Sequence, residues 1–238
     1  MVCLDIGSNI GYYALLERKI VGSEGRVMAV EPSPLIFPYL KKNIQQNGFD
    51  DIEMFNFAFT SSDGEVPFLM ARKSNLSRVV NGSNCSLKEG LVIKVPARSL
   101  DSFAAQYCFK KLDFLRMDVE GHEAEILNGG LWTIERFKPM LLIEVHKSLR
   151  GLKKTVNFLQ NLKSLGYDVK YYIPRELNMP FIGSMKDIKE IGIDHLIKKL
   201  ANNSLPDYFH LLLVNANNCS IDSDMVKHSA RYAFHKGL

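Results

Sequence analysis

The sequence has no apolar run long enough to cross a membrane. A membrane-spanning helix needs about 18–20 consecutive apolar residues, and no window of this 238-residue chain approaches that. The first residues also lack the basic segment and apolar run of a secretory signal, because Met1 leads directly into a strand-like pattern. We therefore expect neither a membrane partner nor export.

Cysteine is scarce and scattered. The four cysteines are Cys3, Cys85, Cys108 and Cys219, and they show neither C-x-x-C nor zinc-site spacing. This pattern predicts reduced thiols and a cytoplasmic location. The N-x-S/T sequons are then expected to be chance matches, and the mild net charge of +4 permits an acidic partner without requiring one.

Strand-like and helix-like patterns alternate along a chain in which 46% of residues are hydrophobic. Helices are expected over residues 35–47 and 99–107 and from 152 to 162, and strands are expected over residues 2–6, 26–30, 52–59, 66–71, 91–95, 114–121, 140–146, 167–173 and 208–215. Such alternation predicts an α/β fold with helices on both faces of a largely parallel sheet.

The predicted domain organisation is simple. One Rossmann-like domain is expected over residues 1–215, followed by a polar tail over residues 216–238. Two stretches inside the domain, 60–112 and 174–207, break the regular alternation. We expect them to be irregular insertions on the substrate side.

Acidic residues occur near the carboxyl ends of four apolar strand patterns. They are Asp5, Glu31, Asp118 and Glu144. Parallel sheets bind their ligands beyond this edge, and burying carboxylates without partners is costly. One such acid is usually a helix cap or is solvated in a loop, whereas four on one rim indicate a site.

The glycine turn "DIGSNIG" narrows the choice of ligand. Asn9 stands where a dinucleotide fingerprint, G-x-G-x-x-G, has its second glycine. Glu31 follows Gly11 by 20 residues, where an acid can bind both hydroxyls of a ribose, and the helix amides after the turn suit a carboxylate. These features suit a ligand that has a ribose, a cationic centre to lie near the acids, and a carboxylate, but no phosphate. S-adenosylmethionine is such a ligand. A nicotinamide or nucleotide cofactor and a turn that binds nothing are the alternatives.

Four segments together resemble one known family, the FkbM-type methyltransferases. They are "DIGSNIGYYAL", "EPSP", "LDFLRMDVEGHEAEILNGG" and "LLIEVH". The resemblance runs from about Val2 to His146 and more loosely to Leu213. It implies a Rossmann-like methyltransferase fold with a mixed seven-stranded sheet, in which residues 208–215 form the antiparallel strand.

The resemblance also implies O-methylation of hydroxyl groups, notably on polyketides and sugars, with S-adenosylmethionine as cofactor. We expect a small-molecule or glycan acceptor. The residues expected to bind the cofactor are Asp5, Gly7, Ser8, Asn9, Gly11 and Glu31.

Methyl transfer to an alcohol needs help with the proton, because a hydroxyl is a poor nucleophile. The candidate catalytic residues are Asp118, His146 and Glu144, with His146 or Asp118 as base. Glu120 and Glu123 could instead cap the next helix, and His146 could bond a loop carbonyl. Carboxylates and imidazoles can also hold a divalent cation, but their spacing matches no metal signature, so no metal is predicted.

Two further classes of function are disfavoured. Val119-Glu120-Gly121 stands where base-modifying amino-methyltransferases carry a proline–aromatic motif, and its acid would repel phosphates, so no nucleic-acid partner is expected. A nicotinamide-dependent oxidoreductase is disfavoured by Asp5 before Gly7 and by the missing second glycine. A non-catalytic cofactor-binding or scaffold domain remains the alternative from another class. The sequence specifies no oligomeric state.

Overall fold

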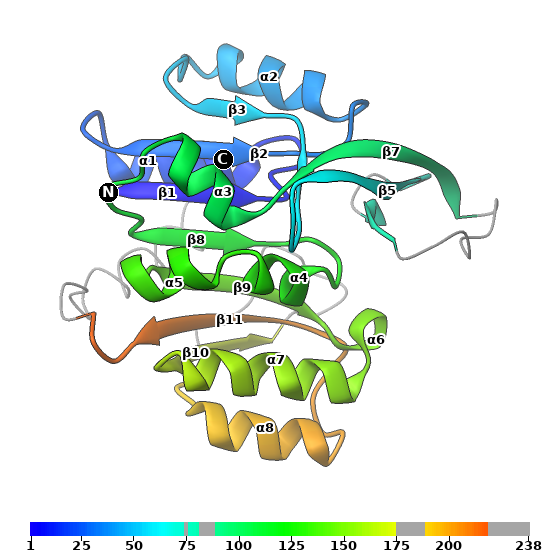
Figure 1. The fold of residues 1–238 in the computed structure, drawn as a ribbon, viewed down its shortest axis with the longest axis vertical. Helices are drawn as coiled ribbons and strands as arrows, with labels where there is room; N and C mark the ends of the chain where they lie inside the picture. Colours follow the sequence, from blue (N-terminus) through cyan, green and yellow to red (C-terminus); the bar gives the residue numbers. More distant parts are fainter. Residues whose placement is uncertain (74–75, 81–88, 175–188, 219–238) are drawn as a thin grey trace. The chain divides into compact units, whose positions relative to one another are not determined.

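The computed structural model describes residues 1–73, 76–80, 89–174 and 189–218. The chain divides into two compact units, Met1–Phe137 and Lys138–Leu238. Figure 1 shows their helices and strands.

The first unit contains a parallel sheet of four strands. In sheet order they are β8 (Phe114–Met117), β1 (Val2–Ile6), β2 (Arg26–Val30) and β3 (Glu53–Phe55). The apolar runs of β1 and β2 are buried almost throughout, as expected for strands covered on both faces. Asp5 lies opposite Arg116 in the register of β1 and β8.

Helices pack on both faces of this sheet. On one face α1 (Tyr12–Val21) and α2 (Phe37–Gln46) share a buried core with Cys3, Val27 and Ala29 of the strands. On the other face Phe103 of α3 (Leu100–Gln106) meets Phe55 of β3 edge to face, with ring centroids 5.1 Å apart. Ser99 caps α3, since its Oγ accepts a hydrogen bond from the Ser102 N–H. The unit also contains two short helices, α4 (Glu123–Asn128) and α5 (Leu131–Phe137).

A second, four-stranded sheet occupies much of the stretch expected to be irregular. In sheet order its strands are β4 (Ala58–Phe59), β7 (Gly90–Arg98), β5 (Gly64–Ala71) and β6 (Arg78–Val79). Its long strands β5 and β7 confirm the strands predicted near residues 66–71 and 91–95. Within the first unit, this sheet projects past the carboxyl ends of β1, β2 and β8 (Figure 1).

The predicted third strand, 52–59, is divided between the two sheets of the first unit. Its first part is β3 and its last part is β4. Between them, the Asn56 side-chain amide donates to the backbone carbonyl of Glu31, 2.8 Å away. Apolar residues resume at Phe57 directly after Asn56, so a single strand was predicted.

The second unit contains three strands joined by antiparallel ladders. In order they are β10 (Tyr167–Pro174), β11 (Tyr208–Asn215) and β9 (Met140–His146). Its helices are α6 (Lys147–Arg150), α7 (Leu152–Ser164) and α8 (Ile193–Ala201). Helix α8 lies inside the stretch 174–207, so the expectation of irregular structure was wrong for residues 193–201. Its buried Ile193, Leu196 and Leu200 follow helical spacing.

The parallel strands of the first unit and the antiparallel strands of the second confirm the predicted α/β class with a mixed set of seven strands. β11 is antiparallel to its neighbours, as predicted. Among the described residues, no helix has the length and hydropathy of a membrane span. Cys85, Cys219 and most of the predicted polar tail lie outside the described residues.

Candidate functional site

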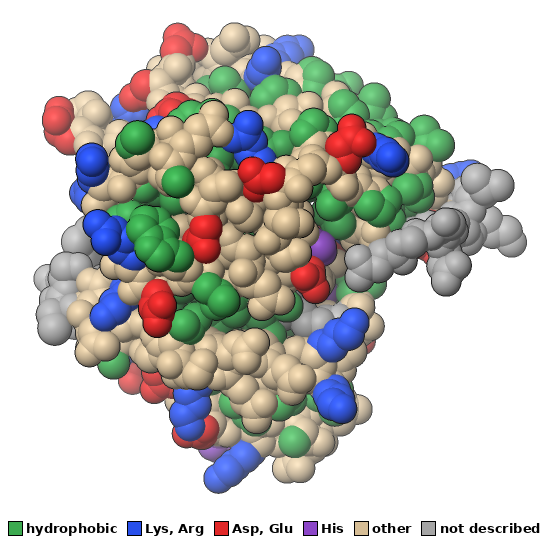
Figure 2. Space-filling model, in the orientation of Figure 1, with side chains coloured by type: hydrophobic (Ala, Val, Ile, Leu, Met, Phe, Trp, Pro, Cys, Tyr) green, Lys and Arg blue, Asp and Glu red, His purple; other side chains and the backbone are tan. Residues whose placement is uncertain are grey.

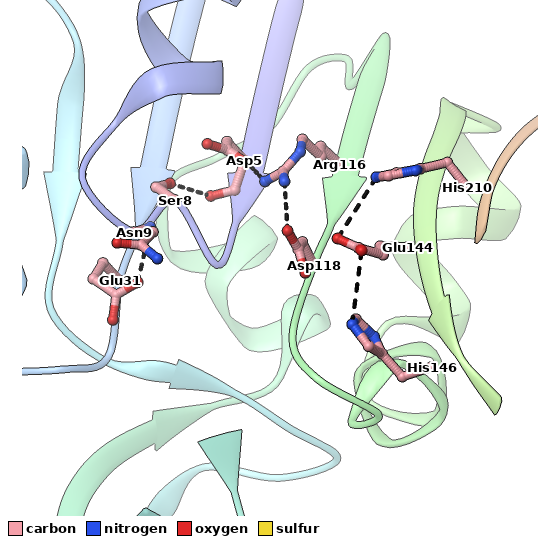
Figure 3. Close-up of polar contacts among 9 residues, drawn as sticks. All are labelled: Asp5, Ser8, Asn9, Glu31, Arg116, Asp118, Glu144, His146 and His210. Carbon is pink, nitrogen blue, oxygen red and sulfur yellow. Dashed lines mark hydrogen bonds and ion pairs between the residues drawn. The ribbon is translucent and has the colours of Figure 1, made fainter. Parts of the chain in front are cut away.

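The glycine turn after β1 is fixed by backbone contacts. The N–H groups of Gly7 and Ser8 both donate to the carbonyl of Val30, each at 3.0 Å. The Ser8 hydroxyl donates to the Asp5 carbonyl at 2.9 Å (Figure 3). Gly7 has a φ of +83°, and a Cβ on it would lie 2.0 Å from the backbone oxygen of Asp118. Glycine is therefore required here by the protein's own backbone, before any ligand is considered.

The end of the turn begins helix α1. Gly11 is the N-cap with a φ of +92°, and its N–H donates to the Ser8 carbonyl at 2.8 Å. Asn9 also adopts a left-handed conformation, with a φ of +49°. Asparagine tolerates this region better than most residues, so the turn is built from residues that suit its shape.

Glu31 directly follows β2 and faces this turn. Its side chain is buried, and each carboxylate oxygen accepts one backbone N–H: Oε2 from Asn9 at 2.9 Å and Oε1 from Ser33 at 2.8 Å. Burial raises the pKa of Glu31 to about 7, although these two hydrogen bonds oppose the shift. The charges of Asp5 and Asp118 add to the increase. The carboxylate is thus pre-positioned, and each oxygen keeps further acceptor capacity.

Arg116 joins two of the predicted acids. It lies in β8, is only 4% exposed, and donates from Nη1 to Asp5 at 2.8 Å and from Nη2 to Asp118 at 2.7 Å (Figure 3). Its guanidinium also lies over the Tyr13 ring, 3.8 Å from the centroid. Burial lowers the pKa of Arg116, but Asp5 and Asp118 outweigh this and hold it above its ordinary value. Asp5 itself is fully buried.

Arg116 was not among the predicted site residues. Its signal in the sequence was a lone cation inside the apolar pattern "FLRMD". A buried cation needs a partner, and Asp5 becomes that partner only through the register of β1 with β8. Burial raises the pKa of nearby Glu17 in α1 well above its ordinary value, and Asp5 raises it further, while Arg116 opposes the shift.

The segment after β8 is a tight turn rather than the strand predicted up to Gly121. Strand β8 ends at Met117, and Glu120 and Gly121 adopt positive φ angles of +54° and +97°. The Gly121 N–H donates to Glu123 Oε1 at 3.2 Å. Glu123 therefore caps the turn before α4, which was the alternative interpretation of this residue. Left-handed non-glycine residues such as Glu120 carry strain and cluster at functional sites.

The predicted residues Glu144 and His146 belong to the second unit. They alternate on β9, so they share one face of the strand. Both are buried, and His146 Nε2 lies 3.8 Å from Glu144 Oε1. On β11, His210 is paired with Glu144 in register, and its Nε2 lies 3.6 Å from Glu144 Oε2 (Figure 3). Sequence reasoning missed His210, whose signal was an imidazole within the apolar run "YFHLLLVN".

Comparisons with known proteins identify the family of this chain. Residues 5–169 match the model of the methyltransferase FkbM domain. Hexuronic acid methyltransferase AglP of Haloferax volcanii is 26% identical over 182 residues, which are 74% of this chain and 71% of that protein. Methyltransferase sdnD of Sordaria araneosa is 23% identical over 154 residues, covering 53% of this chain and 59% of that protein.

The fold is also similar to those of solved methyltransferase structures. Methyltransferase FkbM from Methylobacillus flagellatus KT superposes with a TM-score of 0.50 at 17% identity, over 68% of this chain. The aligned region is 36% of that longer chain.

The fold and the family match define an enzyme that transfers methyl groups from S-adenosylmethionine. The chain belongs to the FkbM methyltransferase domain family.

Proposed function

We propose that this methyltransferase acts on a hydroxyl group of a small metabolite or glycan. The observation that carries the proposal is the buried pair of His146 and Glu144 on β9, because methylating an alcohol requires removal of its proton. AglP is named for a hexuronic acid, a sugar derivative that bears hydroxyl groups. That relative supports a carbohydrate-like acceptor for this chain.

The cofactor is assigned to the residues around the glycine turn. Glu31 would accept the two ribose hydroxyls, because each of its oxygens is already aligned by a backbone N–H and retains acceptor capacity. Gly7, Ser8, Asn9 and Gly11 would line the approach to the ligand backbone. The cofactor supplies a methyl group on a positively charged sulfur.

Asp5 and Asp118 are assigned to the charge of the cofactor rather than to its ribose. Arg116 holds both carboxylates, and Asp5 Oδ2 accepts no hydrogen bond from the part of the chain that the structure describes. We assign Asp118, which is one quarter exposed, the position nearer the ligand. Asp5 would act through Arg116, which orients Asp118.

We assign proton removal to His146, with Glu144 as the residue that orients its ring. A neutral imidazole can take a proton near neutral pH, which makes histidine the commonest general base. The Glu144 carboxylate lies beside Nε2 of His146 and would stabilise the imidazolium that forms. Asp118 is the second candidate for the base.

Kinetics of His146 variants test this assignment. His146→Gln and His146→Ala should lower kcat by roughly 10²–10⁴-fold with little change in cofactor affinity, the result expected when a proton-transfer group is lost. His195→Gln, an exposed histidine on α8, is the matched control and should retain full turnover. An acceptor screen of sugars and polyketide alcohols with labelled S-adenosylmethionine precedes the kinetics. Full turnover by His146→Ala would transfer the role of base to Asp118.

The compartment is proposed from cysteine usage, and the absence of a nucleic-acid partner from the Val119-Glu120-Gly121 segment. Cys3 and Cys108 have free thiols, which is consistent with the predicted cytoplasmic location. Both assignments remain predictions.

A further inference from the structure

A hollow in the first unit lies between the four-stranded sheet and the start of α4. Its volume is about 410 Å³, and its lining residues are Thr60, Ser61, Val66, Pro67, Val79, Val80, His122 and Glu125. This size falls in the range of about 300–1,000 Å³ that is typical of small-molecule sites.

Both sides of the hollow are held in place by contacts within the unit. Thr60 N–H donates to the Arg98 carbonyl at 2.9 Å, which fixes the end of β4 beside β7. His122 Nε2 lies 3.0 Å from Thr60 Oγ1, so the start of α4 is bonded across to β4. At the other end of α4, a Cβ on Gly129 would lie 2.2 Å from the Thr60 carbonyl, so the helix approaches this strand closely.

The hollow lies within reach of the residues assigned to the reaction. His122 follows Asp118 by four residues, so their Cα atoms are separated by at most about 14 Å of extended chain. The intervening turn is tighter than that, because Gly121 bonds back to Glu123. Asp118 therefore lies within about 14 Å of His122, a residue that lines the hollow.

The lining has two chemically different sides. Val66, Pro67 and the two valines near β6 form an apolar wall, while Thr60, Ser61, His122 and Glu125 supply polar groups. Among the described residues that line the hollow, Glu125 is the one acid, and none is a lysine or arginine. Against these residues, a ligand carboxylate would meet the like charge of Glu125 without a lysine or arginine to compensate it, which is unfavourable. Figure 2 shows that hydrophobic side chains also gather on the exposed face of β5 and β7, where Leu91 is 58% exposed.

We infer that this hollow binds the methyl acceptor, and that the acceptor is an uncharged hydroxyl-bearing molecule with an apolar face, such as a neutral glycoside. The inference rests on the proposed function and adds the location and charge of the acceptor. It distinguishes this chain from AglP, whose name specifies a hexuronic acid.

Two probes that differ in one carboxylate test the inference. 4-Nitrophenyl β-glucoside and 4-nitrophenyl β-glucuronide would be titrated into the full chain saturated with S-adenosylhomocysteine, with binding followed by calorimetry and saturation-transfer NMR. The glucoside should bind at least about tenfold more tightly, a difference of about 1.4 kcal/mol. Glu125→Gln should reduce this preference by raising the affinity for the glucuronide.

Filling the hollow tests its location. Val66→Trp should weaken glucoside binding at least about tenfold, with unchanged affinity for S-adenosylhomocysteine. Val92→Trp places the same side chain at an exposed position of the same sheet outside the lining, and should leave both affinities unchanged. Unchanged affinity for the cofactor product also shows that Val66→Trp is folded.

Three results would overturn the inference: no binding of the glucoside, equal or tighter binding of the glucuronide, or equal glucoside affinity in Val66→Trp and Val92→Trp. Failure of the proposed hydroxyl chemistry is a different observation, because it shows in the product as a methyl group on nitrogen, sulfur or carbon.

Discussion

Glu31 combines burial, two backbone hydrogen bonds and a pKa near neutrality. Its position after β2 follows from the sequence, but its alignment depends on the turn, because one of its two donors is Asn9, 22 residues away. A carboxylate held in this way loses little freedom when it binds hydroxyl groups. Its contribution to cofactor binding should therefore be large for a single residue.

Glu31→Ala should weaken the binding of S-adenosylmethionine by about 1.5–3 kcal/mol, the scale of hydrogen bonds to a charged group. Calorimetry measures this directly. Glu24→Ala, an exposed acid in the loop before β2, is the control and should bind normally. Unchanged affinity in a folded Glu31→Ala protein would remove Glu31 from the cofactor site.

The raised pKa of Glu31 predicts a pH dependence of stability without cofactor. The folded protein holds this proton up to about pH 7, whereas the ordinary pKa of a glutamate carboxyl is about 4.5. The unfolded chain therefore releases the proton first, and rising pH lowers the free energy of unfolding by up to about 3 kcal/mol across this window. Glu31→Gln has no titratable proton at this position, so its free energy of unfolding should not fall for this reason. Chemical denaturation between pH 5 and 8 should show the free energy of unfolding of the unmodified protein falling relative to that of Glu31→Gln as pH rises. A constant difference between the two proteins would contradict the assignment.

Arg116 stabilises two buried or half-buried carboxylates at once. Arg116→Met should lower the free energy of unfolding by about 3–5 kcal/mol, because Asp5 would remain buried without its counter-ion. The double variant Asp5→Asn, Arg116→Met should recover part of this loss. Arg136→Met removes an exposed arginine and should cost less than about 1 kcal/mol. Similar urea midpoints for Arg116→Met and Arg136→Met would show that the buried ion pair has no such role.

At the scale of elements, the turn after β1 and the turn after β8 are built against each other within the first unit. The Gly7 Cα faces the Asp118 carbonyl so closely that no side chain fits. Gly48, after α2, also has a positive φ, of +70°, but a Cβ there would meet nothing within 4 Å. Substitutions at these two glycines therefore distinguish the cost of a left-handed backbone from the cost of a steric clash.

Gly48→Ala should cost about 1 kcal/mol, the strain of a non-glycine residue in the left-handed region. Gly7→Ala should cost more than this, because it adds a backbone clash to the same strain, and it should also weaken cofactor binding by displacing Asp118. Denaturation and calorimetry on both variants check the order. Equal losses of stability would mean that the close approach to Asp118 relaxes at little cost.

Strands that carry a continuous apolar pattern were predicted to within a few residues. Residues 2–6, 26–30, 140–146 and 208–215 form strands with the predicted bounds. The errors lie where long-range contacts decide the structure. A strand was predicted over residues 114–121, but β8 ends at Met117, because the backbone adopts left-handed conformations at Glu120 and Gly121.

The candidate site was partly predictable for the same reason. Acids at strand ends and glycines in a turn are visible in a sequence, whereas charge partners across strands depend on register. Arg116 meets Asp5, and His210 meets Glu144, only through pairings between strands that are distant in the chain. Each was visible as a polar residue in an apolar run, but its partner was not.

At the scale of the whole molecule, the family match over residues 5–169 covers the glycine turn, Glu31, Arg116, Asp118 and the pair on β9. The residues assigned to the cofactor belong to the first unit, and the proposed base belongs to the second. Cofactor binding is therefore expected to depend on residues of the first unit.

The central claim is that the methyl group is transferred to a hydroxyl oxygen. The most direct measurement uses S-adenosylmethionine labelled with ¹³C in its methyl group, a mixture of neutral glycosides and polyketide alcohols, and NMR of the labelled product. We predict a methyl ether whose formation is abolished by Glu31→Ala and strongly slowed by His146→Gln. A labelled methyl group on nitrogen, sulfur or carbon, in a product whose formation depends on Glu31, would contradict the account.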